Sequence, residues 1–145
     1  MGIYLGLDSS TQSLKAMIAD SSSGKILYSE SLNFGADLPQ FRCPSGFLEN
    51  PDPLVRHSDP MMWLAAMDLL FSRMKQKNAP LSLVEGISGS GQQHGSVFLN
   101  SSFTDKLKNL DPSKELVPQL ESTLAMQTSP IWMDSSTGEE VREIS

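Results

Sequence analysis

The sequence predicts a mixed α/β domain organised around a five-stranded sheet, and two observations carry that prediction. Three strand-like runs open the chain, separated only by short polar turns: residues 3–8, 14–20 and 25–32. A helix-like segment from about Pro60 to Lys75 is then followed by two more apolar runs, near residues 84–88 and 96–100. We therefore expect an antiparallel meander of three strands, joined by the two later strands, with the helix packed on one face of the sheet.

The first connection of the meander is rich in hydroxyl groups. Asp8 ends the first strand, and Ser9-Ser10-Thr11-Gln12-Ser13 leads into the second. A connection this short is typical of an antiparallel hairpin. Its backbone amides and hydroxyls could together hold an anion, as successive amides do in a nest. An ordinary polar hairpin without a ligand is the competing interpretation.

The predicted helix has clear signals at its start. Asp59 and Pro60 supply a capping acid and a proline at the first helical position. The spacing of apolar residues predicts one core-facing side and two flanking positions: Leu64, Met67, Phe71 and Met74, with Trp63 and Leu70 beside them. The segment before the helix, about residues 33–58, lacks periodicity and is rich in proline. We interpret it as a long irregular insertion, and such segments tend to be functional or mobile.

A glycine-rich elbow interrupts the apolar runs that follow the helix. Its sequence is Gly91-Gln92-Gln93-His94-Gly95, and Val97-Phe98-Leu99 resumes the apolar pattern. Glycines allow sharp turns and a close approach of the backbone to a ligand. Two amides and an imidazole offer both donors and acceptors, which suits them to reading hydroxyl groups. A glycine-rich turn without a ligand remains the alternative.

The last third of the chain is weakly patterned. Residues 100–128 permit short helices interrupted by prolines. Ser129-Pro130-Ile131-Trp132-Met133-Asp134 is then predicted to be a short strand ending on an acid. Ser136 and Glu139 match a capping box that opens a final helix.

Composition excludes several functional classes. The chain has 145 residues, 39% of them hydrophobic, and a net charge of −6, which suits one domain with a core and argues against a general nucleic-acid binder. The lone Cys43 cannot form an internal disulfide, and no apolar run approaches the ~20 residues that span a bilayer. The start of the chain lacks the pattern of a signal peptide. We therefore expect a cytoplasmic protein with neither nucleic acid nor membrane as its partner.

Three stretches of the sequence resemble the FGGY carbohydrate kinases. They are Tyr4-Leu5-Gly6-Leu7-Asp8-Ser9-Ser10-Thr11-Gln12-Ser13-Leu14-Lys15, the Gly91-Gln92-Gln93-His94-Gly95 elbow and Ile131-Trp132-Met133-Asp134. The form of the elbow is especially similar to that of eukaryotic-type xylulokinases. The resemblance implies a ribonuclease-H-like half-domain, the fold shared by actin, hexokinase and the sugar kinases.

The resemblance also implies roles for individual residues. Asp8 matches the family acid that lies near Mg²⁺, which it holds through water, and near the transferred phosphate. The phosphate loop of the family matches Ser10, Thr11, Gln12 and Ser13, and the basic residue after it matches Lys15. Gln93 and His94 match the positions that contact the sugar, and Asp134 lies in the stretch that lines the sugar pocket. The cofactors that follow are ATP and Mg²⁺, and the expected substrate is D-xylulose.

The chain departs from the family pattern in two ways. Ser10 stands where the phosphate loop usually has glycine, which is compatible with the turn if that position needs no positive φ. Family members are also several times longer, and their aspartate base and adenosine-binding motifs match nothing in residues 1–145. We therefore expect the N-terminal part of the first kinase domain, truncated and without its second domain, which would be its partner in the same protein. Such a piece should not turn over by itself.

Two further interpretations stay open. One is another pentulose or polyol kinase of the same family, although glycerol-type relatives carry charged residues where Gln93 and His94 stand. The other is a non-catalytic, actin-like interaction module. Modules of that class lack the Gln-Gln-His elbow and the Ile-Trp-Met-Asp stretch.

Overall fold

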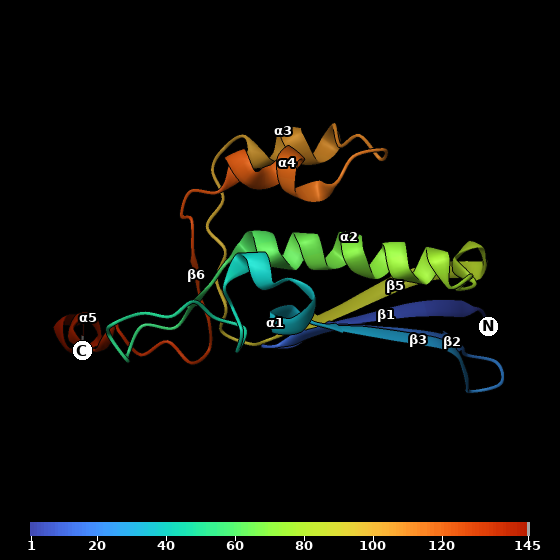
Figure 1. The fold of residues 1–145 in the computed structure, drawn as a ribbon, viewed down its shortest axis with the longest axis horizontal. Coiled ribbons are helices and arrows are strands. Elements are labelled where there is room, and N and C mark those ends of the chain that lie inside the picture. The colour runs from blue at the N-terminus through green and yellow to red at the C-terminus, as the bar shows by residue number, and fades with distance from the viewer. Residues whose placement is uncertain (145) are drawn as a thin grey trace.

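A mixed four-stranded sheet forms the base of the fold. The computed structural model describes residues 1–144 (Figure 1). The strands of the sheet are β1 (Ile3–Ser9), β2 (Ser13–Asp20), β3 (Lys25–Asn33) and β5 (Val84–Gly91). Their order is β3-β2-β1-β5, with β1 antiparallel to β2, β2 antiparallel to β3, and β1 parallel to β5. The predicted meander is therefore confirmed.

The prediction of a fifth strand in this sheet, at residues 96–100, is wrong. The left-handed backbone of His94 (φ 58°) follows the end of β5, and Figure 1 shows the chain rising from there toward the outer helices. Residues 96–100 pair instead with a later segment, through Ser96 N–H to Pro130 O (3.1 Å), Ala125 N–H to Phe98 O (2.8 Å) and a bridge between Leu99 and Leu124. The apolar pattern of residues 96–100 predicts an extended segment, but it does not specify the segment with which these residues pair.

Helix α2 (Pro60–Gln76) covers one face of the sheet, as predicted. The carboxylate of Asp59 caps it by accepting a hydrogen bond from Met61 N–H at 2.8 Å. The side chains that face the sheet are fully buried: Met62, Ala66, Leu70 and Met74. The predicted core face was therefore partly wrong, because Leu64 is only half-buried and Leu70 lies at the centre of the core rather than beside it.

The position of α2 as a middle layer explains that difference. Helices α3 (Phe103–Lys108) and α4 (Leu116–Leu120) lie on the side of α2 away from the sheet (Figure 1), and η3 (Glu121–Thr123) follows α4. Asp68 of α2 accepts a hydrogen bond from Leu116 N–H at 2.7 Å, and its burial raises the pKa of its carboxyl group. An apolar pattern that serves two layers does not define a single face.

Two ion pairs join the last turn of α2 and the residue after it to α1 and β3. Lys77 contacts Glu30 of β3 at 2.7 Å, and Arg73 contacts Asp37 at 2.6 Å. Hydrogen bonding to Arg73 lowers the pKa of Asp37, so this carboxylate is charged at neutral pH. The turn after α2 leads through η2 (Leu81–Leu83) into β5.

The predicted irregular insertion, residues 33–58, contains three short elements and is otherwise irregular, as expected. These are α1 (Phe34–Asp37), η1 (Pro39–Phe41) and β4 (His57–Ser58). The side chain of Asn33 caps α1, and Phe34 is completely buried in the core. The start of the insertion is therefore packed onto the core, whereas residues 49–54 are exposed.

Only part of the predicted strand at residues 129–134 forms a strand. β6 (Ser129–Pro130) pairs antiparallel with β4 as a separate two-stranded sheet. The last helix, α5, covers Gly138–Ile144. It begins beyond Ser136, whose hydroxyl donates to Asp134 Oδ1 at 2.7 Å instead of capping the helix at the predicted position.

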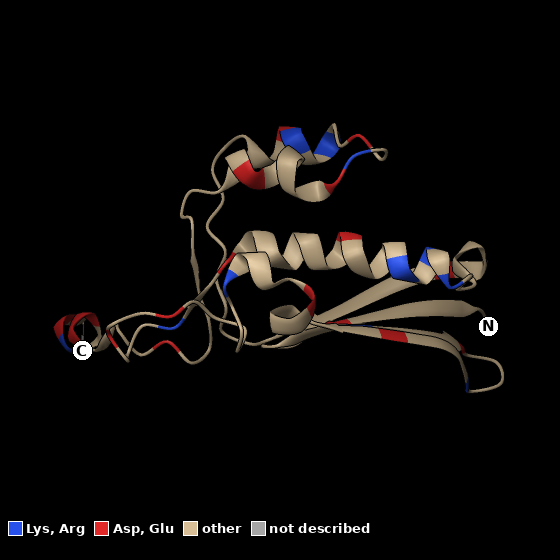
Figure 2. Ribbon diagram, viewed as in Figure 1, with Lys and Arg blue, Asp and Glu red and all other residues tan. Residues whose placement is uncertain are grey.

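Charged residues of both signs are interspersed over the part of the chain that is described (Figure 2). This distribution fits the net charge of −6 and offers no basic stripe of the kind that follows a nucleic-acid backbone, within residues 1–144. Within the same residues, every helix is too short or too polar to cross a membrane.

Candidate active site

The parallel pairing of β1 and β5 brings two polar segments to the same edge of the sheet. Asp8 is paired with Ser90 in register, and the Ser90 hydroxyl donates to Asp8 Oδ1 at 2.6 Å. Beyond the strands, Gln92 N–H donates to Ser9 O at 2.9 Å. Because parallel strands run in one direction, their carboxyl ends must lie side by side, and this edge is the usual ligand position of an open α/β sheet.

A cavity of about 430 Å³ lies at this edge. It brings together most of the residues predicted to bind phosphate and sugar. Its lining consists of Asp8, Ser9, Ser10, Thr11, Gly91, Gln92, Gln93, His94 and Trp132. Segments more than eighty residues apart in the sequence therefore line the same cavity.

The hairpin between β1 and β2 has a compact hydrogen-bonded geometry. Ser10 N–H donates to Ser13 O at 2.9 Å, and the two serine hydroxyls lie 2.8 Å apart. Ser10 is not among the residues with positive φ, so serine fits where the family loop usually has glycine. Gln12 and Ser13 line a neighbouring cavity of about 590 Å³ on the other side of the hairpin, together with Thr11 and Trp132.

Residue Gly46 of the insertion supports the hairpin from behind. Its φ is +88°, and a Cβ placed there would overlap the carbonyl oxygen of Thr11. No other amino acid allows this approach without displacing one of the two backbones. The insertion therefore takes part in fixing the position of the hairpin.

The elbow presents its polar side chains on the surface of the cavity. Gln93 and His94 are both exposed, which leaves their amide and imidazole groups accessible to a ligand. His94 holds φ at 58°, an uncommon conformation for a residue other than glycine. Ser96 N–H then ties the elbow to Pro130 O at 3.1 Å. Backbone strain of this kind is frequent at binding sites, where the surrounding structure over-determines it.

Lys15 lies next to Asp8 but opens onto a different cavity. The two residues are paired in register on β1 and β2. Both line a cavity of about 670 Å³ over the open face of the sheet, which Ser29 and Ser31 of β3 and Ser90 also line. Asp8 belongs to both cavities and so marks the point where they meet.

Trp132 is a site residue that the sequence reasoning did not single out. Its Nε1–H donates to Thr11 Oγ1 at 2.9 Å, and its side chain is still 54% exposed. It lines the cavities on both sides of the hairpin. The sequence signal is the tryptophan in the Ile-Trp-Met-Asp stretch. At the end of a strand, an aromatic ring with one polar N–H group can offer a ligand both an apolar surface and a hydrogen bond.

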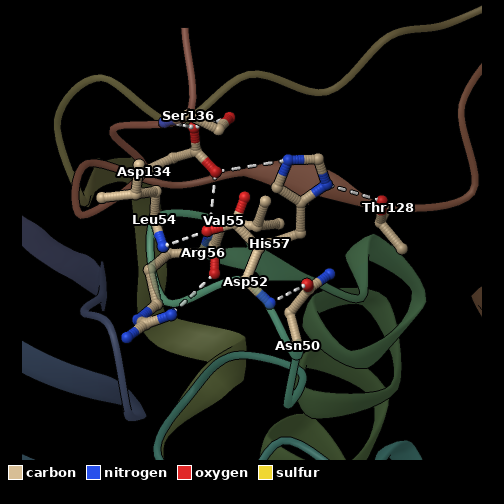
Figure 3. A network of polar contacts seen from close by, with 9 residues as sticks. All are labelled: Asn50, Asp52, Leu54, Val55, Arg56, His57, Thr128, Asp134 and Ser136. Carbon is tan, nitrogen blue, oxygen red and sulfur yellow. Dashed lines mark hydrogen bonds and ion pairs between the residues drawn. The ribbon is translucent and has the colours of Figure 1, made fainter. Parts of the chain in front are cut away.

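Asp134 does not line these cavities, and its carboxylate contacts Arg56, His57 and Ser136 instead (Figure 3). Its side chain is only 8% exposed and accepts hydrogen bonds from Arg56 N–H at 2.8 Å and from Ser136. His57 Nε2 lies 3.4 Å from the same carboxylate. Burial raises the pKa of Asp134, but these hydrogen bonds and the nearby His57 outweigh burial and lower it overall. A direct sugar contact from Asp134 stays a prediction.

The residues of the cavity suit a magnesium ion that is held mainly by phosphate and water. Asp8 contributes one carboxylate at the junction of the cavities. Within residues 1–144, no group of three or more His, Cys, Asp or Glu side chains is arranged to hold a metal. Mg²⁺ bound with a nucleotide commonly takes only one or two carboxylates and keeps several waters, so a single acid at this position fits.

The chain is similar in fold and in sequence to sugar kinases. No family model matches the chain. In sequence it is similar to xylulose kinases: 40% identical over 143 residues to xylulose kinase 2 of Arabidopsis thaliana, and 37% identical over 140 residues to xylulose kinase of Mus musculus. The resemblance to the FGGY carbohydrate kinases, and within them to eukaryotic-type xylulokinases, is confirmed.

These relatives are much longer than the chain. The matches cover 98% and 97% of this chain but only about 25% of each relative. The chain therefore spans about a quarter of the length of the curated proteins that it matches.

Solved structures support the fold. A xyloylose kinase from Brucella ovis matches 98% of the chain and 23% of its own length, with a TM-score of 0.67 and 20% sequence identity. Plasmodium falciparum glycerol kinase with ADP matches 100% of the chain and 23% of its own length, with a TM-score of 0.57 and 19% identity. At this level of identity the likeness concerns the fold alone.

Proposed function

We propose that this chain forms the phosphate hairpin and part of the sugar pocket of an ATP-dependent kinase that phosphorylates D-xylulose on its primary 5-hydroxyl. The observation that carries the proposal is the shared cavity, in which Asp8 and the hairpin face Gln93 and His94. The 40% identity to a plant xylulose kinase favours D-xylulose over other pentuloses and polyols.

The hairpin suits the phosphate side of such a reaction. Ser10 and Thr11 line the cavity, and neutral donors such as hydroxyl and free backbone N–H groups hold phosphate without a basic patch. Asp8 would hold Mg²⁺ through water, and the ion supplies charge neutralisation at the phosphates when it is bound. The role of the hairpin is positioning, on which phosphoryl transfer mainly depends.

The elbow suits the sugar side. Gln93 donates and accepts through its amide, and His94 does so through its imidazole, so both can pair with hydroxyls that also donate and accept. The indole of Trp132 offers an apolar surface to the carbon face of a sugar. His94 reads hydroxyls rather than removing a proton, because among residues 1–144 no carboxylate is hydrogen-bonded to its ring to orient it as a base.

The proton acceptor and the adenosine site belong, in this proposal, to the part of the protein outside residues 1–145. The curated relatives are about four times as long as the segment they share with this chain. General-base assistance contributes about 10²–10⁴-fold to rate, and closure of two domains excludes water and aligns the reacting groups. We therefore expect the 145-residue chain alone to release no ADP from ATP, Mg²⁺ and D-xylulose. A cytoplasmic location stays a prediction.

The test is ADP release by the complete protein that contains this segment. D-xylulose should stimulate ADP release well above D-ribulose and glycerol, and Asp8→Ala should abolish it. His94→Ala should weaken apparent D-xylulose affinity by about 1–3 kcal/mol while leaving ATP affinity nearly unchanged. Equal stimulation by glycerol would favour a polyol kinase, and an unchanged D-xylulose affinity in His94→Ala would remove the elbow from the sugar site.

A further inference from the structure

His57 connects two segments that lie far apart in the sequence (Figure 3). Its Nδ1 lies 2.8 Å from Thr128 Oγ1, and its Nε2 lies 3.4 Å from Asp134 Oδ2. One imidazole therefore contacts both ends of the segment 128–134. The His57 side chain is 24% exposed, so solvent protons reach it, whereas the Asp134 side chain is almost buried.

The segment 128–134 carries one wall of the candidate active site. Trp132 stands between the two residues that His57 contacts and lines the cavity. Only short backbone pairings hold the segment to its neighbours: Ile131 N–H to Arg56 O (3.0 Å), Ser135 N–H to Leu54 O (3.0 Å) and Ser96 N–H to Pro130 O (3.1 Å). The strands that pair here, β4 and β6, have two residues each, so side-chain contacts contribute much of what fixes the wall.

The charge on His57 decides how strongly it holds this segment. As a cation it donates from both ring nitrogens, to the Thr128 hydroxyl and toward the Asp134 carboxylate. As a neutral ring it keeps both contacts only with its proton on Nε2 and the Thr128 hydroxyl donating, and the attraction between opposite charges is lost.

Other charged residues lie near His57 in the chain or on segments that pair with it. They are Glu49, Asp52, Arg56 and Asp59, in addition to Asp134. Among the described residues, only Asp134 forms an ion pair with His57. The Arg56 guanidinium donates instead to Val55 O at 2.8 Å and lies over the Phe47 ring.

We propose that His57 is a positioning residue, which in its protonated form clamps Thr128 and Asp134 and so fixes Trp132 against the hairpin and elbow. Protonation of His57 then tightens the wall of the sugar pocket, and deprotonation loosens it. The coupling between His57 and Trp132 is a property of this chain alone, whereas its effect on sugar binding rests on the proposed function.

The first experiment follows the Trp132 indole N–H resonance of the isotope-labelled chain between pH 5 and 8.5. The chain has only two histidines, so each serves as the control for the other. We expect the Trp132 resonance to shift with the same midpoint as the His57 ring, and the shift to vanish in His57→Gln. It should persist in His94→Gln. A Trp132 shift that follows the His94 ring, or that survives in His57→Gln, would overturn the proposal.

Thr128→Val gives a second arm that leaves the charge pair in place. This variant removes the hydroxyl from one end of the clamp at nearly constant volume. We expect the Trp132 shift to become smaller while its midpoint continues to follow the His57 ring. If His57→Gln does not fold, the unaltered chain and Thr128→Val still test the proposal. In either protein, a Trp132 indole shift whose pH midpoint differs from that of the His57 ring would overturn it.

The second experiment uses the complete protein that contains this segment, and measures D-xylulose dissociation constants of the unaltered protein and of His57→Gln at pH 6 and pH 8.5. We expect His57→Gln to bind about two- to fivefold more weakly at pH 6, the size typical of a partly exposed ion pair, and equally at pH 8.5. A ratio independent of pH indicates a merely structural residue and contradicts the proposal. Absence of D-xylulose binding at both pH values would contradict the proposed function, while the Trp132 titration still tests the clamp.

Discussion

The two sides of the candidate active site are held in different ways. The side proposed to bind phosphate, called the phosphate side below, consists of the ends of β1, β2 and β5. β1 pairs with each of the other two at seven positions, with one irregularity in the β1–β5 pairing between Ile3 and Tyr4. The sugar-side wall, residues 128–134, is held by two-residue strands and by the side chains of His57 and Asp134. Backbone pairing therefore positions the first side, and individual side chains position the second.

This difference predicts how each side responds to substitution. A sheet edge keeps its geometry when a surface side chain changes, because the ladder hydrogen bonds do not involve that side chain. A loop wall loses geometry when one buried partner is removed, because the remaining polar groups are left without partners. Substitutions of equal size should therefore have unequal effects on the two sides.

The largest effect is expected where the insertion meets the hairpin. Gly46→Ala should destabilise the fold by about 3 kcal/mol or more, because its Cβ overlaps the Thr11 carbonyl and its φ is +88°. Gly24→Ala is the matched control: its φ is +68°, but nothing lies within 4 Å of the added Cβ, so we expect about 1 kcal/mol. Urea unfolding compares the two. Equal decreases in unfolding free energy for Gly46→Ala and Gly24→Ala would show that the close approach of Gly46 to Thr11 does not support the hairpin.

On the wall, Asp134→Ala should cost about 2–3 kcal/mol of unfolding free energy. It leaves Arg56 N–H and His57 without their acceptor in a nearly buried place. Asp111→Ala serves as the control, because that carboxylate is exposed and bonded only to its neighbours Ser113 and Lys114, so we expect a loss below about 1 kcal/mol. Similar midpoints for the two variants in urea would contradict the assigned role of Asp134.

The pH dependence of the unfolding free energy tests how much the charge of Asp134 contributes to stability. Because the folded chain lowers the pKa of Asp134 from 3.8, this group contributes stability above that pH and loses it as the pH falls through the lowered value. The difference in unfolding free energy between the unaltered chain and Asp134→Asn should therefore shrink as the pH drops below about 3.8. Denaturant unfolding at a series of pH values measures it. A constant difference would mean that the charge of Asp134 makes no contribution.

The smallest effect is expected for the contact that joins the two sides. Trp132→Phe removes the hydrogen bond from Nε1 to Thr11 Oγ1 and keeps an aromatic ring. We expect D-xylulose to bind about two- to twelvefold more weakly, because one hydrogen bond contributes about 0.5–1.5 kcal/mol. Trp63→Phe, in the interior helix, should leave the affinity unchanged in calorimetric titration. Equal affinities for Trp132→Phe and the unaltered chain would remove this ring from the pocket.

The phosphate side could be predicted from the sequence because local patterns specify it. Alternation fixed the three strands of the meander, and Asp8 and the hydroxyl hairpin follow directly from the end of the first strand. The glycine elbow lies at the same edge because β5 runs parallel to β1. Within the meander, neighbours in sequence are also neighbours in space.

The sugar-side wall could not be predicted because its partners are distant in sequence. The apolar run at 96–100 was assigned to the main sheet, although it pairs with residues 124–130. His57 and Asp134 meet across 77 positions, and neither carries a periodic signal. The face of α2 was likewise misjudged, since the layer formed by α3 and α4 is not visible in the helix's own pattern.

The most direct test of the shared site is a map of ligand-induced shifts in the backbone amides of the chain. D-xylulose should move the resonances of residues 92–95 and of Trp132, and inorganic phosphate should move those of residues 9–13. Each ligand should also perturb Asp8, which lies where the cavities meet. Shifts confined to one ligand, or xylulose shifts located away from the elbow, would contradict a single phosphate and sugar site at this edge of the sheet.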